Sequence, residues 1–194
     1  MYLSERLGLR GSGGYPYEAP PCWYTNFKGV MIHEIKDFLP EEFLKKLRDQ
    51  FFETNDWETS SQFWNKSLYE YDGGQVGPCF VGKGDFKDYN EGLSDLVSRM
   101  AGQKVGYVET LMYRWTPGSC ILWHDDHGHD ANITLYVSEW ERNWGGELML
   151  EDGRWIAPEK NKLLIFLEQI SHRTNLRLPD TPERLTLQTF VKYE

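Results

Sequence analysis

A histidine- and aspartate-rich segment, residues 123–130, holds the side chains best suited to chemistry in this chain of 194 residues. His124 and Asp126 are two residues apart, so on a β-strand their side chains lie on one face. His172, which follows the apolar run 162–167, can supply a third ligand. Two imidazoles and one carboxylate on one face of a metal leave its other positions open, which is typical of Fe(II) sites that bind O2 and a chelating co-substrate.

A solvated polar loop is the competing interpretation of this segment, because a His-x-Asp pair alone is common. His127 and His129 have the same spacing and are competing ligands, although they lie beside Gly128 and past the expected strand. His172 and His33 are each compatible with a structural, hydrogen-bonded histidine.

A cationic residue, Arg184, lies 12 residues after His172. Alternation along the strand-like run 184–193 places it on one polar face with Thr186 and Gln188. A buried arginine needs an anionic partner, and a guanidinium binds a carboxylate through two parallel hydrogen bonds. A dicarboxylate that chelates the metal at one end and contacts Arg184 at the other meets both needs. The alternative is an edge-strand arginine paired with a surface acid.

Short strand-like runs dominate the chain after about residue 104, and turn signals separate them. Their even spacing favours a sandwich or jelly roll over an α/β sheet. The runs are 105–115, 120–126, 133–138, 147–151, 154–157, 162–167 and 184–193.

Two helices are expected before these strands. Residues 30–39 read as a strand that leads into a helix, where Pro40 suits the first turn and apolar residues recur every four positions. Residues 90–101 form an amphipathic pattern with Asn90 as a candidate cap. The Gly-rich segment 72–92 predicts a long loop between the helices.

These patterns predict an α+β, mainly β protein with a jelly-roll core and N-terminal helices packed on one sheet. We expect an irregular arm over residues 1–29 and a single domain over 30–194, with the motifs in about 104–194. The loop 72–92 and the aromatic part of the arm, residues 15–24, are candidates to close over a substrate.

Composition narrows the functional class. The chain is 40% hydrophobic and has a net charge of −9, which disfavours broad binding to nucleic acids or anionic membranes. Its three cysteines follow no CxxC spacing and predict free thiols in a reducing compartment. The N-terminus lacks a signal-peptide core and no apolar run is long enough to span a membrane, so we expect a cytoplasmic protein.

The order and spacing of His124-x-Asp126, His172 and Arg184-x-Thr186 resemble the Fe(II)- and 2-oxoglutarate-dependent dioxygenases, especially their prolyl 4-hydroxylase-like branch. Tyr113 lies where that branch carries a tyrosine upstream of the His-x-Asp pair. Further similar segments are residues 133–138, 144–148 and, more loosely, 30–47.

The resemblance implies a double-stranded β-helix form of the jelly roll, with three iron ligands: His124, Asp126 and His172. It also implies that Arg184 binds the distal carboxylate of 2-oxoglutarate, with hydrogen bonds from Thr186 and Tyr113. The chain departs from the family at Thr174, where a small apolar residue is usual. Thr134 lies two residues before Tyr136 rather than four, so no co-substrate role is assigned to either.

The activity that the resemblance implies is hydroxylation of a prolyl residue or another amino-acid-like substrate, with release of succinate and CO2. Fe(II) and 2-oxoglutarate are the expected cofactors, with ascorbate as an additional candidate, and the expected partner is a small-molecule or peptide substrate. The alternative is a non-catalytic or zinc-binding, cupin-like jelly roll that uses His124, His127, His129 and His172.

Overall fold

Two sheets face each other in the computed structural model, which describes residues 32–194 apart from 63, 72–73 and 78. The larger sheet has seven strands in the order β1-β11-β8-β13-β6-β5-β2, and the smaller sheet has four in the order β10-β9-β12-β7. Neighbouring strands within both sheets are antiparallel.

The strand bounds of the larger sheet, in sheet order, are Ile32–Ile35, Leu163–Phe166, Ala131–Tyr136, Arg184–Tyr193, Val105–Trp115, Phe80–Gly82 and Trp57–Thr59. Those of the smaller sheet are Trp155–Ile156, Leu148–Leu150, His172–Thr174 and Ile121–His124. A separate hairpin pairs β3 (Glu70–Tyr71) with β4 (Gly74–Gln75), and two 3₁₀ turns cover Ser60–Gln62 and Lys66–Leu68.

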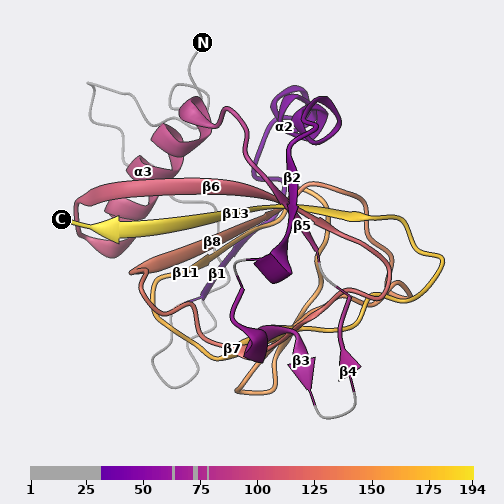
Figure 1. The fold of residues 1–194 in the computed structure, drawn as a ribbon. Coiled ribbons are helices and arrows are strands. Elements are labelled where there is room, and N and C mark those ends of the chain that lie inside the picture. The colour runs from indigo at the N-terminus through magenta and orange to yellow at the C-terminus, as the bar shows by residue number, and fades with distance from the viewer. Residues whose placement is uncertain (1–31, 63, 72–73, 78) are drawn as a thin grey trace.

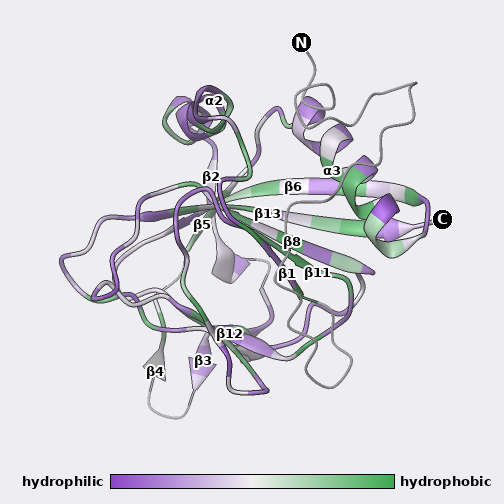
Figure 2. Cartoon of the chain, turned by 180° about the vertical axis from the view of Figure 1, so that it is seen from behind, coloured by the Kyte–Doolittle hydropathy of each residue, from purple (hydrophilic) through white to green (hydrophobic). Residues whose placement is uncertain are grey.

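The helices α2 (Glu41–Glu53) and α3 (Lys87–Ala101) lie on one side of the larger sheet, and the smaller sheet lies on the other (Figure 1). Both helices carry hydrophobic and hydrophilic residues on different faces (Figure 2). Their buried residues, such as Leu44 and Leu93, pack with Leu185, Leu187 and Val191 of β13 in the main core. The opposite face of β13 is therefore left to line the space between the sheets.

The expected fold class, an α+β jelly roll with N-terminal helices on one sheet, is confirmed. Each strand-like run after residue 104 overlaps an observed strand. However, β7 ends at His124, so Asp126 follows the strand rather than lying within it.

Two local expectations are wrong. Asn90 does not cap α3, because the helix begins at Lys87. Its side chain instead accepts a hydrogen bond of 2.5 Å from the Thr110 hydroxyl on β6. The segment 72–92 is also not one long loop, since it contains β4, β5 and the first turns of α3.

The expectations for the N-terminal arm, the cysteines and a membrane span can be compared with the structure only over the described residues. The arm 1–29, including residues 15–24 and Cys22, lies outside the described residues. Cys79 and Cys120 are free and buried. In the described part of the chain, no helix has the length and apolar character needed to cross a membrane.

Candidate metal centre

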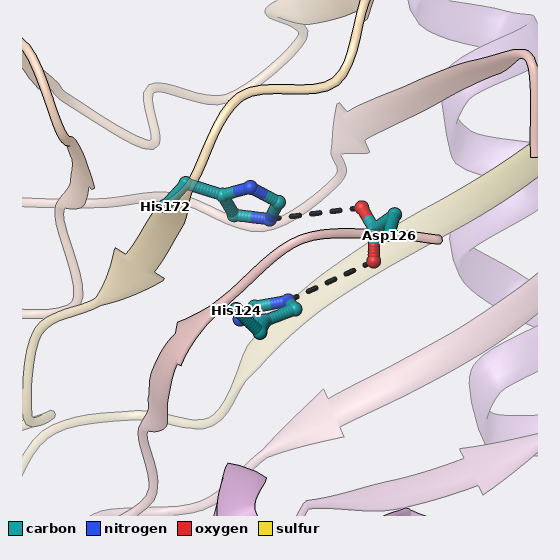
Figure 3. A group of neighbouring side chains, drawn as sticks. All are labelled: His124, Asp126 and His172. Atoms are coloured by element: carbon teal, nitrogen blue, oxygen red, sulfur yellow. Dashed lines mark ion pairs between the residues drawn. The ribbon is translucent and has the colours of Figure 1, made fainter. Parts of the chain in front are cut away.

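Three side chains converge at one end of the space between the sheets (Figure 3). His124 at the end of β7 and His172 at the start of β12 are cross-strand partners, and their ring centroids lie 4.3 Å apart. Asp126 lies two residues beyond β7. Its Oδ1 is 3.7 Å from Nε2 of His124, and its Oδ2 is 3.7 Å from Nε2 of His172. One ligand atom from each residue lies within 4.8 Å of the others, and all three residues are half-buried. These spacings exceed hydrogen-bond distances and suit a shared ion.

The backbone fixes the tautomer of both imidazoles. Nδ1 of His124 lies 2.8 Å from the carbonyl oxygen of Leu122, and Nδ1 of His172 lies 2.9 Å from that of Ile170. A carbonyl oxygen only accepts, so each Nδ1 donates and each Nε2 presents a lone pair toward Asp126. Burial, and then the neighbouring His172, lower the pKa of His124 and favour its neutral form. The donor set thus fits a divalent metal.

The competing histidines are engaged elsewhere. His127 is 76% exposed at its side chain, where Nε2 lies 3.2 Å from the Asp125 carboxylate and Nδ1 lies 2.7 Å from the Gln169 side-chain oxygen. The ring of His129 packs against Phe190, with centroids 4.5 Å apart. Among the described residues, the metal-binding group contains neither of them, so the geometry does not support the four-histidine zinc site.

The second end of the site is cationic. Arg184, at the start of β13, is 2% exposed, and its Nη1 donates to the carbonyl of Gly146. Its guanidinium carbon lies 4.6 Å from the centre of the Trp115 ring, and its buried Nε has no hydrogen-bond partner. Burial lowers the pKa of Arg184 to about 10, so the side chain stays positive near neutral pH. A buried cation with an unsatisfied donor fits an anionic ligand.

Thr186 and Tyr113, the other residues expected at this end, are cross-strand partners on β13 and β6. Thr186 accepts a hydrogen bond of 3.0 Å from the Trp115 indole, which leaves its own hydroxyl proton for another acceptor. Tyr113 belongs to an aromatic cluster with Trp64 and Trp115, in which its ring centroid lies 6.2 and 6.0 Å from theirs and the two indoles lie 6.0 Å apart. Burial, and then neighbouring groups that include Asp126, raise its pKa.

Tyr136 on β8 is a residue to which the sequence assigned no role. It is 3% exposed and is the cross-strand partner of Thr186. Burial raises the pKa of Tyr136 to about 12, and the nearby charge of Arg184 opposes this rise. Its position in β8, rather than its spacing from Thr134, is what brings the phenol to the cationic end.

Arg177 is a second buried arginine that the sequence did not indicate. It is 1% exposed, donates to Thr181 and to the carbonyl of Pro182, and its Nε has no hydrogen-bond partner. Gly146 separates it from Arg184: a Cβ on this glycine would lie 2.9 Å from Nη1 of Arg184 and 3.5 Å from Nη1 of Arg177. Leu176 and Leu178 on either side of Arg177 are exposed, so a hydropathy pattern, which expects apolar residues to be buried, does not predict that the arginine is buried.

One cavity of about 760 Å³ joins the two ends. Its lining includes the triad, Arg184, Thr186 and Tyr136, and it is bordered by Trp64 and Leu68 from the segment that follows β2. A small dicarboxylate and part of a second molecule can therefore share the space between the sheets.

Residues 109–192 match the model of the 2OG-Fe(II) oxygenase superfamily. No curated protein matches the chain. Among solved structures, a prolyl-4-hydroxylase from Pseudomonas putida is 19% identical, with 83% of this chain and 92% of that chain covered and a TM-score of 0.64.

Two further structures share the fold. A Trichoplax adhaerens prolyl hydroxylase in complex with a hypoxia inducible factor peptide fragment is 15% identical, with 82% of each chain covered and a TM-score of 0.67. The viral collagen prolyl hydroxylase of Paramecium Bursaria Chlorella virus-1, in a 2OG complex, is 12% identical, with 82% of this chain and 94% of that chain covered and a TM-score of 0.61.

Proposed function

We propose that this chain, whose residues 109–192 match the 2OG-Fe(II) oxygenase superfamily, is an oxygenase that hydroxylates a prolyl residue or another amino-acid-like substrate. The observation that carries the proposal is one cavity with a His-Asp-His group at one end and a buried arginine at the other. The relative solved with a peptide fragment supports a polypeptide substrate.

At the metal end, we assign Fe(II) to the Nε2 atoms of His124 and His172 and to the carboxylate of Asp126. When bound, Fe(II) and 2-oxoglutarate would activate O2, which is the oxidant: one of its oxygen atoms would enter the substrate hydroxyl and the other the succinate that forms, with CO2, from 2-oxoglutarate. Asp126 offsets part of the metal charge, and the carbonyls of Leu122 and Ile170 hold the imidazoles in the ligating tautomer.

At the cationic end, we assign the distal carboxylate of 2-oxoglutarate to Arg184 and Thr186, with Tyr136 as a further donor. Arg184 offers an unsatisfied Nε–H, and the two hydroxyls each have a proton to donate. Tyr113 stays a predicted ligand of the same carboxylate, and its stacking with Trp64 and Trp115 gives the cavity a rigid aromatic wall.

Ascorbate as a reductant for the iron and a cytoplasmic location remain part of the proposal. The free, buried thiols of Cys79 and Cys120 are compatible with a reducing compartment.

The test is anaerobic addition of Fe(II) and 2-oxoglutarate to the wild-type protein and to two variants. We expect a weak visible charge-transfer band in the wild type and in His127→Ala, because the His127 side chain lies outside the metal group. His124→Ala should lack the band. Equal, featureless spectra for the wild type and His124→Ala would refute the assignment.

Substrate identity follows from mass spectrometry of a panel of proline-containing peptides and free amino acids. The expected product is heavier by one oxygen atom, and succinate is released in step with it. Succinate release without any oxygenated product would show that the panel lacks the substrate, while absence of both would count against the proposed reaction.

A further inference from the structure

The outer face of the smaller sheet carries one row of large side chains that crosses all four strands. We call the row formed by Trp123, Arg173, Met149 and Trp155 the outer row. Arg173 is the cross-strand partner of Met149, and Met149 is the partner of Trp155. The guanidinium carbon of Arg173 lies 5.1 Å from the Trp123 ring centre, and two of its nitrogens lie 3.2 Å from the Met149 sulfur.

Arg173, Met149 and Trp155 lie on the face of the smaller sheet that is directed away from the cavity, and Trp123 lies on the edge strand, where it also borders the cavity. The neighbouring residues Leu148, Leu150 and Ile156 on the same strands are buried between the sheets. By contrast, Trp155 is 56% exposed and Trp123 is 44% exposed. Tryptophan, methionine and arginine are the residue types enriched where proteins bind polypeptides. Arg173 stacks on Trp123, and Met149 lies between Arg173 and Trp155, so the row presents exposed aromatic and thioether groups of the kind found at interaction sites.

The row is continuous with the reaction cavity. Trp123 lines that cavity as well as beginning the row, and it directly precedes the metal-binding His124. Its strand, β7, is the edge strand of the smaller sheet. A polypeptide that leaves the cavity over this edge meets Trp123 first and then passes Arg173, Met149 and Trp155 in turn.

The length of the row sets the length of its ligand. Three strand-to-strand spacings of about 4.8 Å give a track of about 14 Å. A polyproline II chain rises about 3.1 Å per residue, so about four or five residues cover the track. Such a chain has no internal hydrogen bonds, and its carbonyls are open to donors such as Nη1 of Arg173.

We propose that the outer row binds the polypeptide segment beside the prolyl residue that enters the cavity. This inference rests on the proposed function. Proline rings pack on the faces of indoles, and a preformed polyproline II chain loses little entropy on binding, as in other aromatic-lined grooves.

The test measures binding of fluorescein-labelled oligoprolines of two, six and ten residues to the full chain with Fe(II) and 2-oxoglutarate under anaerobic conditions. We expect the affinity to rise from two to six residues, because one residue fills the cavity and about five cover the row. From six to ten residues the affinity should level off.

Substitutions at Trp155 test the far end of the row. Trp155→Ala should weaken binding of the six-residue peptide about 3- to 10-fold, the range for one aromatic contact, and should leave the two-residue peptide unaffected. Trp155→Phe should recover most of the loss, whereas Trp155→Gln, which lacks a ring, should not. Phe52→Ala, at a residue of α2 that is 71% exposed, is the matched control and should bind like the wild type.

Failure of this inference differs from failure of the proposed function. Length-independent affinity, or wild-type binding by both Trp155→Ala and Trp155→Gln, overturns the inference even when 2-oxoglutarate binds normally. Absence of 2-oxoglutarate binding in the wild type instead overturns the function. A dimer in sedimentation experiments that Trp155→Ala dissociates would assign the row to a second copy of this chain, which also overturns the inference.

Discussion

The two ends of the cavity are built in opposite ways. At the metal end, each histidine is oriented by a carbonyl only two residues earlier in the chain. At the cationic end, Arg184 contacts Gly146, 38 residues away, and the ring of Trp115 on a neighbouring strand. The orientation of each imidazole is therefore set locally, although the pairing of β12 with β7 is needed to bring the two rings together, whereas the orientation of Arg184 itself depends on contacts with distant segments.

The two ends also differ in what they leave unsatisfied. Both imidazoles have one nitrogen hydrogen-bonded and one directed at a common point. Arg184 and Arg177 are almost completely buried, and each has an Nε without a hydrogen-bond partner. Burying a charged donor without a partner is costly. An anion bound at this end would supply the missing hydrogen-bond acceptor and so stabilise the folded protein.

The largest effect is expected when the metal end is broken alone. Asp126→Ala should lower succinate release by about 10³-fold or more, since a bound metal contributes several kcal/mol to the transition state. Asp125→Ala is the control, because its carboxylate pairs with the exposed His127 instead. Binding of 2-oxoglutarate through Arg184 should persist in part. Full activity of Asp126→Ala would remove this residue from the metal site.

Breaking the cationic end should give a large effect of a different kind. Arg184→Gln should raise the KM for 2-oxoglutarate about 10- to 150-fold, since a charge-assisted hydrogen bond is worth about 1.5–3 kcal/mol. Metal affinity, measured by equilibrium dialysis with Mn(II), should stay unchanged. An equal fall in metal affinity would mean that the two ends are not independent.

A smaller effect is expected from a methyl group placed between the two arginines. Gly146→Ala should lower the free energy of unfolding by more than Gly153→Ala, and thermal unfolding of both variants measures the difference. Both glycines have positive φ, 81° and 88°, which costs alanine about 1–2 kcal/mol. Only at Gly146 would the new Cβ also meet Arg184, whereas nothing lies within 4 Å at Gly153. Equal losses would show that the close approach carries no energetic weight.

The smallest effect is expected at Arg177. Gly146 separates it from Arg184, so we expect it to attract 2-oxoglutarate through its charge and not by direct contact. Arg177→Met should raise the KM for 2-oxoglutarate about 5-fold, equivalent to about 1 kcal/mol for one partly screened charge. Arg177→Lys keeps the charge and should retain most of the affinity. If lysine and methionine gave the same KM, the hydrogen bonds to Thr181 and Pro182 would matter more than the charge.

The contrast between the ends explains how much could be predicted from the sequence. Periodicity identified the helices and the strands after residue 104 other than β12, because burial against one layer imposes a regular pattern. The spacing of His124 and Asp126 predicted that they share one face, and the family resemblance implied His172 as the third ligand, although Asp126 lies after the end of β7 rather than within it.

The cationic end was only partly predictable. Alternation placed Arg184 on one polar face with Thr186 and Gln188, but an edge-strand arginine paired with a surface acid was an open alternative, and the structure shows that Arg184 is buried. Arg177 lies in an irregular segment between exposed Leu176 and Leu178, the reverse of the usual burial order. Tyr136 and Gly146 come to this end through pairings between distant strands and loops, which a single sequence does not display.

The carbonyl contacts of the two imidazoles have a further consequence. Leu122 and Ile170 hold the rings through the protein's own backbone, so the ligating tautomer of each imidazole is set by the chain itself. A half-buried set of nitrogen and oxygen donors accepts several divalent ions of similar size. We therefore expect other divalent ions of similar size, such as Mn(II) and Co(II), to compete with Fe(II) for this site.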